Sequence, residues 1–362
     1  MVNRELYPYE PDYAISPGVT LSEVLESLNM TQIELSKRTG KSQKTITQII
    51  KGDAPITSAT SIEFERATGV PAKFWNNLES NFREQIAYID ERKTLAKKVK
   101  WLNDLPIKNM IKAGWLKKID DPVLQLKEVL NFYGITSPNQ WMKIWQAPEC
   151  AFRKSQVFKS NPIAVSAWLR EGEIRSNQID CNPYDKDKFK KTLSQLRNLT
   201  GKTPDAFESE LKKLCAECGV ALVFVKEIPE VRVNGVSRWI GKDKALIQLT
   251  IRYKTDDQLW FTFFHEASHI LLHGKKMIFI DNNNNADDEL EQEANLFCSN
   301  FLIPQNEYEI FSQNTSFSES SIKEFAKQVG IAPSIVLGRL QHDGKVEYNR
   351  FYDLKIKLQW AN

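Results

Sequence analysis

Two histidines and a glutamate stand close together in His265-Glu-Ala-Ser-His269, within an apolar stretch from Thr255 to Gly274. Residues four apart lie on one face of an α-helix, about one turn apart, so both imidazoles can reach one metal ion. Glu266 would project beside them, where its carboxylate can accept a proton from water. Three of the chain's four histidines lie here, and buried imidazoles need polar partners. The pattern favours a metal-dependent hydrolase over a buried helix with two structural histidines.

The ends of this apolar helix are also marked in the sequence. Thr255 and Gln258 have the spacing of a capping box, in which each side chain satisfies a backbone N–H of the first turn. Gly274 stands where a left-handed residue commonly closes a helix. We therefore expect one helix between Thr255 and Gly274, with both histidines inside it.

A second helix is expected to supply the third ligand, because a catalytic zinc site has three protein ligands and an open fourth position. Between Asp287 and Pro304 apolar residues recur at spacings of three and four, which predicts a helix ending at the proline. Glu291 lies roughly 60° from the centre of the apolar stripe and Glu293 roughly 100° away on its other side. Glu291 is therefore expected to point inward and join the two histidines.

Two further side chains are placed to support such a site. Asn295 lies one turn beyond Glu291, on the same side of the helix, and is expected to hydrogen-bond a ligand histidine. His273 competes with Glu291 for the place of third ligand, or it serves the C-terminus of the first helix, where positive charge is favoured. The second role of His273 is the preferred one, and the sequence leaves both open.

The residues around both helices resemble the ImmA/IrrE family of metallopeptidases over roughly residues 205–345. The resemblance is carried by Phe264-His-Glu-Ala-Ser-His-Ile-Leu-Leu-His273, by Glu291-x-x-Ala-Asn-x-Phe-x-x-x-x-Leu-Ile-Pro304 and by Asn234-Gly-Val-Ser-Arg-Trp239. It implies a gluzincin-like domain in which His265, His269 and Glu291 bind one Zn²⁺ per chain, or Mn²⁺. Glu266 would be the catalytic base of a zinc metalloendopeptidase, and the implied substrate is a protein regulator.

The first ninety residues carry a second functional pattern. Thr31-Gln-Ile-Glu34 is spaced as a capping box that opens a helix, Gly40 makes a turn, and Ser42 caps another helix that Gly52 closes. Between Leu35 and Gly52 there are five basic residues and no acidic one. Such a local concentration of positive charge is typical of a surface that binds DNA.

This segment resembles the XRE-type helix-turn-helix, and HigA antitoxins in particular, over roughly residues 14–85. Ile15-Ser-Pro-Gly18, Gly40-Lys-Ser42, Ile56-Thr57 and Phe74-Trp75 carry the resemblance. It implies a homodimer on an inverted-repeat operator in double-stranded DNA. By that resemblance the side chains facing the major groove are Gln43, Lys44, Thr45, Thr47 and Gln48, and those meeting phosphates are Gln32, Lys41 and Lys51. The alternative is a helical module that mediates only protein contacts.

The rest of the chain sets the domain organisation. Its length and composition shifts predict a helix-turn-helix domain at 1–90, a helical middle domain at 91–200 and a metallopeptidase domain at 201–362. Strand-like runs at Val220–Val225 and Ala245–Thr250 add a small sheet, so the expected class is mainly α with a small β-sheet (α+β). If Ala245–Thr250 forms an exposed edge, it would hold an extended peptide by main-chain pairing.

Several segments are expected to play a structural part. The basic residues of 91–118 would form solvated helix faces, Cys215-x-x-Cys218 would pack in a core, and the helix–glycine–helix pattern around Gly330 would pack on the peptidase core. Residues 1–15 are expected to form an extended arm and 281–288 a polar loop. Scattered cysteines and the lack of a long apolar run predict a cytoplasmic protein without a membrane partner.

Together these patterns predict a DNA-binding regulatory metallopeptidase that cleaves a repressor, a toxin or itself, in control of transcription or a toxin–antitoxin response. The alternative is a transcriptional repressor or antitoxin in which zinc is only structural. An open fourth coordination position would favour the enzyme, and four closed protein ligands would favour the repressor.

Overall fold

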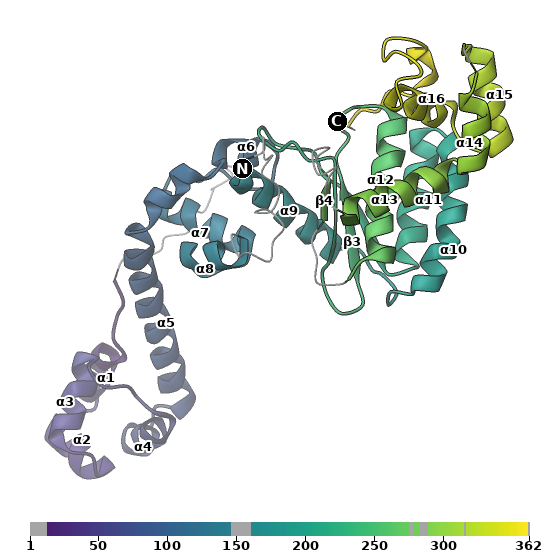
Figure 1. Ribbon diagram of the computed structural model, residues 1–362. Coiled ribbons are helices and arrows are strands. Elements are labelled where there is room, and N and C mark those ends of the chain that lie inside the picture. The colour runs from purple at the N-terminus through teal and green to yellow at the C-terminus, as the bar shows by residue number, and fades with distance from the viewer. Residues whose placement is uncertain (1–12, 146–160, 275–278, 282–288, 315, 361–362) are drawn as a thin grey trace, which may run out of the picture. The chain divides into compact units, whose positions relative to one another are not determined.

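The computed structural model describes residues 13–145, 161–274, 279–281, 289–314 and 316–360. Most of the expected N-terminal arm and of the expected polar loop at 281–288 therefore lie outside the described residues. Contacts divide the chain into two compact units, Met1–Val99 and Lys100–Asn362, and each is described by itself. Helices dominate and the sheet has four strands, which confirms the expected mainly α class with a small sheet (Figure 1).

The first unit is built from five helices around one core. They are α1 (Pro17–Ser27), α2 (Gln32–Thr39), α3 (Gln43–Lys51), α4 (Ser58–Thr68) and α5 (Ala72–Ala96). The fully buried side chains of their core are Leu21, Leu35, Ile46, Phe64 and Trp75. Because α5 runs through residue 90, the first unit extends beyond the expected boundary.

Local signals set the turn between α2 and α3. Gly40 has φ +71° and Gly52 has φ +81°, the left-handed conformation that glycine adopts without a steric penalty. The side chains of Thr31 and Ser42 accept hydrogen bonds from the N–H groups of the third helical residues. Only half of the first capping box forms, because the Glu34 carboxylate pairs with Arg38 at 2.5 Å.

The second unit contains the sheet and the remaining helices. Its helices are α6 (Ile107–Lys112), α7 (Pro122–Tyr133), α8 (Pro138–Trp145), α9 (Pro162–Asn177), α10 (Lys186–Arg197), α11 (Pro204–Ala216), α12 (Asp256–Leu272), α13 (Glu289–Leu302), α14 (Gln305–Ser312), α15 (Glu319–Val329) and α16 (Pro333–His342). Short 3-10 helices are η1 (Val99–Asp104, at the boundary between the units), η3 (Asn198–Gly201) and η4 (Tyr352–Leu354). The strands are β1 (Val220–Phe224), β2 (Gly235–Trp239), β3 (Ala245–Leu249) and β4 (Phe279–Asp281).

The strand order is β1-β3-β2-β4, with β1 and β3 parallel and the other pairs antiparallel. The register places Val220 opposite Ala245 and Gly235 opposite Leu249. The condition for peptide pairing at Ala245–Thr250, an exposed edge, is not met, because β3 is paired on both sides. A peptide cannot add to a strand whose backbone groups already bond two neighbours.

Both faces of the sheet are buried, which explains why β1 is apolar throughout. Alternate residues of β1 point to opposite faces: Val220 and Leu222 join the core around α12, and Ala221 and Val223 join the core formed with α7–α9. The residues expected to form a separate middle domain thus pack on the same sheet as the C-terminal helices. That residues 1–90, 91–200 and 201–362 fold as three independent domains stays a prediction.

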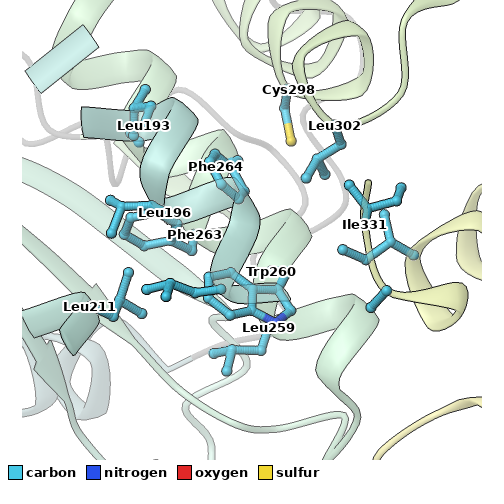
Figure 2. Close-up of a cluster of buried hydrophobic side chains, with 14 of the residues drawn as sticks. Leu193, Leu196, Leu211, Leu259, Trp260, Phe263, Phe264, Cys298, Leu302 and Ile331 are labelled. Atoms are coloured by element: carbon cyan, nitrogen blue, oxygen red, sulfur yellow. The ribbon is translucent and has the colours of Figure 1, made fainter. Parts of the chain in front are cut away.

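Helix α12 lies at the centre of the larger core. Its Trp260, Phe263 and Phe264 are fully buried, and Figure 2 shows them facing Leu193, Leu196 and Leu211 of α10 and α11. On its other sides α12 packs against α13, α16, β2 and β3. These neighbours fix the positions of the buried α12 side chains, including those that could do chemistry.

The start of α12 is held by a segment near the C-terminus instead of the expected capping box. Thr255 is the N-cap residue, but its side chain makes no capping hydrogen bond. The Asp256 N–H donates to the Ile356 carbonyl at 3.1 Å, and the Asp256 carboxylate accepts from the Ile356 N–H at 2.8 Å and from the Ser334 hydroxyl at 2.6 Å. The capping-box prediction is therefore wrong, because a tertiary contact satisfies the helix start.

The end of α12 also differs from the expectation. The helix stops at Leu272, and His273 follows with extended backbone (φ −106°, ψ 163°), its N–H donating to the His269 carbonyl at 3.1 Å. Gly274 does not have a positive φ, so the expected left-handed closure is wrong.

Candidate metal centre and helix-turn-helix

Helices α12 and α13 bring His265, His269 and Glu291 together in one buried cluster. The two Nε2 atoms are 3.0 Å apart, and the Glu291 Oε2 lies 3.1 Å from the Nε2 of His265 and 3.6 Å from that of His269. All three residues are less than a tenth exposed. The three side chains that helical spacing selected thus lie together in the structure, and their binding of a metal stays a prediction.

The cluster has the dimensions of a tetrahedral metal site. Ligand atoms at about 2.0–2.2 Å from a zinc ion lie roughly 3.3 Å from one another. The three separations of 3.0, 3.1 and 3.6 Å bracket that edge length. Two imidazole nitrogens and one carboxylate oxygen are also the ligand types that zinc prefers. The residues fit the ion that the sequence predicts.

The electrostatics of the cluster keep its ligand atoms available. Burial lowers the pKa of His269 to about 4, so its imidazole is neutral at physiological pH. Burial raises the pKa of Glu291, but the neighbouring His265 and His269 outweigh this effect and hold that pKa at about 2. Metals bind neutral imidazole and ionised carboxylate, which are the forms present here.

Glu266 lies beside the ligands and is fully buried against strand β2. Gly235 of β2 has no side chain, and a Cβ placed there would lie 2.9 Å from the Cγ and the Oε1 of Glu266 and 2.7 Å from the Cγ2 of Thr262. No real Cβ contact is that short without a shift of its neighbour. The space left by Gly235 thus fixes where the Glu266 carboxylate lies, a feature that the sequence did not single out.

A cavity of about 690 Å³ reaches the cluster between α12, α13, α16 and the C-terminal segment. His265 and Glu291 line it at one end. Its walls are largely apolar and are formed by Phe261, Leu296, Leu302, Ile303 and Ile335, with Arg339, Tyr348 and Lys355 among its polar lining. The cavity is large enough for several side chains of a bound polypeptide.

The other two predicted supporting residues have different positions. His273 is not in the cluster: its Nδ1 lies 2.8 Å from the Nδ1 of His269, and its Nε2 lies 3.3 Å from the Oε2 of Glu293. Asn295 lines the cavity, and among the described residues no hydrogen bond joins it to either ligand histidine. The role of Asn295 stays a prediction. His273, and not Asn295, makes the contact with a ligand histidine, namely His269.

The residues predicted to contact DNA lie on α2, on α3 and next to their turn. Gln32, Gln43, Lys44, Gln48 and Lys51 are exposed, and Lys41, Thr45 and Thr47 are partly exposed. The Thr47 hydroxyl lies 3.4 Å from the Gln32 Oε1, which joins the two helices. Lys41 is paired with Glu63 of α4 at 2.9 Å, a partner that the sequence did not indicate. Their DNA contacts stay predictions.

Comparison with protein families agrees with both patterns. Residues 21–75 match the helix-turn-helix family, and residues 224–341 match the Peptidase M78 family, described as the IrrE N-terminal-like domain. The chain therefore combines an XRE-type helix-turn-helix with an IrrE/ImmA-like peptidase domain. The second match includes the whole cluster, Glu266 and Gly235.

Three solved structures are each similar to 23% of this chain. An addiction module antidote protein of the HigA family from Coxiella burnetii is 28% identical over 23% of this chain and 92% of its own, with a TM-score of 0.22. The antitoxin HigA of Pseudomonas aeruginosa with its promoter is 26% identical over 23% and 90%, with a TM-score of 0.22. An antidote protein of a plasmid maintenance system from Nostoc punctiforme is 24% identical over 23% and 92%, with a TM-score of 0.23. The comparison with curated proteins gave no match.

None of the helices in the described part is long and apolar enough to cross a membrane.

Proposed function

We propose that the chain is a DNA-binding regulatory metallopeptidase, which cleaves a protein regulator and so changes transcription or a toxin–antitoxin response. The observation that carries this proposal is the convergence of His265, His269 and Glu291 beside a fully buried Glu266. The match of this segment to the IrrE-like peptidase family supports it. The substrate class, a repressor, a toxin or the chain itself, comes from the sequence resemblance.

Each residue of the site has a separate part in peptide hydrolysis. His265, His269 and Glu291 would hold one Zn²⁺, with Mn²⁺ as the other candidate. The bound ion would lower the pKa of a water and polarise the scissile carbonyl. Glu266 would take the proton of the attacking water and return it to the leaving amine. The neighbouring backbone of Gly235 holds the Glu266 side chain in place for this transfer.

The cavity beside the cluster is where the substrate would bind. It begins at His265 and Glu291, so a polypeptide lying in it has a main-chain carbonyl within reach of the ligands. Its apolar walls suit hydrophobic side chains next to the cleaved bond. Since β3 is internal, main-chain pairing of the substrate with that strand is no part of the proposal.

The helix-turn-helix would give the peptidase its place on the genome. Exposed Gln43, Lys44 and Gln48 on α3 suit base edges, and Lys51 suits a phosphate. A homodimer on an inverted repeat in double-stranded DNA, inside the cytoplasm, is the arrangement that the resemblance favours. The competing function is a repressor or antitoxin with a structural metal, which a closed site with four protein ligands would favour.

The test compares the zinc-loaded wild type with Glu266→Gln, which keeps the size of the side chain but removes the base. Both proteins are incubated with helix-turn-helix repressors encoded in neighbouring genes, with and without single- or double-stranded DNA, and products are identified by mass spectrometry. We expect cleavage of one repressor, or of the chain itself, by the wild type only, with equal zinc content in both proteins. Equal cleavage by both proteins would remove the peptidase proposal, and so would zinc-loaded wild type that cleaves none of these candidates.

A further inference from the structure

His273 and Glu293 form a chain of contacts that ends on the metal cluster. The Glu293 Oε2 is 3.3 Å from the His273 Nε2, the His273 Nδ1 is 2.8 Å from the His269 Nδ1, and the His269 Nε2 faces His265 and Glu291. The His273 side chain is only 3% exposed, and that of Glu293 is 56% exposed. The contacts thus run from the surface of α13 to the buried ligand.

The hydrogen-bonding chemistry of Glu293, His273 and His269 decides which ring nitrogen of each histidine carries the proton. We call the resulting arrangement the order of protons. An ionised carboxylate only accepts hydrogen bonds, so the Nε2 of His273 must carry a proton to bond Glu293. In a neutral imidazole the Nδ1 of His273 is then an acceptor, and the Nδ1 of His269 must donate to it. Neutral His269 therefore has its lone pair on Nε2, which is the atom that faces the cluster.

The reverse order of protons fails at the Glu293 end, and at the other end it occupies the His269 nitrogen that a cation would need. If the His273 Nδ1 donated to His269, the His273 Nε2 would present a lone pair to the Glu293 carboxylate at 3.3 Å. The Nε2 of His269 would then carry a proton toward the other ligands. The short contact of 3.0 Å between the Nε2 atoms of His265 and His269 agrees with the first order, because His269 can accept there from His265.

We propose that His273 and Glu293 are positioning residues for the metal site, which fix the His269 imidazole in the tautomer and orientation that bind a divalent cation. The inference rests on the proposed function, since it takes the cluster to be a metal site. The backbone strengthens the arrangement: the His273 N–H donates to the His269 carbonyl at 3.1 Å, so main chain and side chain of His273 both hold His269. Among the described residues, no hydrogen bond or ion pair joins His273 or Glu293 to His265 or Glu291.

The test measures zinc affinity by competition with a chelator, together with the visible spectrum of the Co²⁺-substituted protein. His273→Leu removes the acceptor, and we expect zinc binding to weaken about 10- to 100-fold, with a changed Co²⁺ spectrum. His273→Asn keeps an acceptor near the position of Nδ1 but cannot reach Glu293, so it should recover part of the loss. Glu293→Gln should weaken binding by a smaller factor, because Glu293 is half exposed and the contact is long.

A matched variant on the same helix separates the hydrogen bond from the charge. Glu289→Gln removes one exposed carboxylate from α13 and touches no ligand, so its zinc affinity should equal that of the wild type. Equal affinity in wild type and His273→Leu, or equal weakening by Glu289→Gln and Glu293→Gln, would overturn this inference and leave the metal site intact. Failure of the wild type to bind zinc or Co²⁺ would instead overturn the proposed function itself.

Discussion

The helix-turn-helix and the candidate metal centre place their predicted functional side chains in opposite environments. On α3 most of the predicted DNA-contacting residues are exposed, whereas His265, Glu266 and His269 on α12 are almost completely buried. The first site is held by local devices, namely two side-chain caps and two left-handed glycines. The second is held by Gly235, Glu293 and Ile356, which lie far from α12 in the sequence.

This difference follows from what each site must do. A DNA-reading helix needs only to be short, stable and accessible, because its partner supplies the other half of every contact. A site for hydrolysis has to keep its histidine ligands neutral and its carboxylate ligand ionised. It also has to hold the catalytic base within a fraction of an ångström of its working position. We therefore expect single substitutions to have large effects around α12 and graded effects around α3.

The largest effect should come from removing a ligand. His265→Ala and Glu291→Ala should each reduce zinc from about one ion per chain to almost none and abolish hydrolysis, because the remaining ligands no longer form a three-point site. Metal analysis of the purified proteins measures this, with Glu289→Ala as the control that keeps zinc. Retention of a full equivalent of zinc by Glu291→Ala would show that another side chain is the third ligand.

The second effect concerns the base and should leave zinc in place. Gly235→Ala forces the Glu266 side chain away from β2, so kcat should fall about 10²-fold while zinc content stays at one ion per chain. Gly241→Ala is the matched control, since a Cβ at Gly241 meets no atom within 4 Å. Unchanged kcat in Gly235→Ala would mean that the position of Glu266 does not depend on this space.

These two predictions also show what the sequence could and could not provide. The choice of His265, His269 and Glu291 follows from helical spacing and from the three protein ligands that a catalytic zinc needs, and the caps and glycines around α3 follow from their residue types. The order of the strands does not, and for that reason the sequence left open whether β3 lies at an edge. The packing of Gly235 on Glu266 and the contact of His273 with Glu293 arise only when separate elements meet, so no local pattern marks them.

The third effect tests how the distant C-terminal segment supports α12. Lys355 is paired with Asp257 at 2.7 Å, and both side chains are less than a tenth exposed. Lys355→Met leaves the Asp257 charge buried without its partner, and should destabilise the start of α12 by about 3–5 kcal/mol. Hydrogen exchange of α12 amides measures the loss.

Lys323→Met is the control for this third effect. It breaks the exposed pair with Glu319 on α15, whose side chains are more than half exposed, and should cost less than about 1 kcal/mol. If the two substitutions raised α12 exchange equally, the C-terminal segment would have no special part in holding the helix.

The fourth effect belongs to the exposed site and should be graded. Gln43→Ala should cost about 1–3 kcal/mol on the preferred operator and relax the preference for one base pair, since an amide can read a base edge. Lys44→Ala removes one positive charge and should weaken binding to DNA by the amount that this lost charge contributes. Titrations against the selected operator and a scrambled duplex separate the two, and a loss of equal size on both duplexes with Gln43→Ala would exclude base reading by this residue.

The smallest effect should come from the ion pair between Lys41 and Glu63. Their side chains are 22% and 35% exposed, and the 2.9 Å contact competes with any phosphate that Lys41 would bind. Glu63→Gln should release Lys41 and tighten binding to operator and scrambled duplex alike by a few-fold, because phosphate contacts do not depend on sequence. Lys41→Ala should weaken binding to both duplexes and reduce the salt slope by about 1.

In the Lys41→Ala background Glu63→Gln should have little effect, since the lysine it would release is gone. An equal gain from Glu63→Gln in both backgrounds would mean that Glu63 acts only by repelling DNA, and that Lys41 makes no phosphate contact.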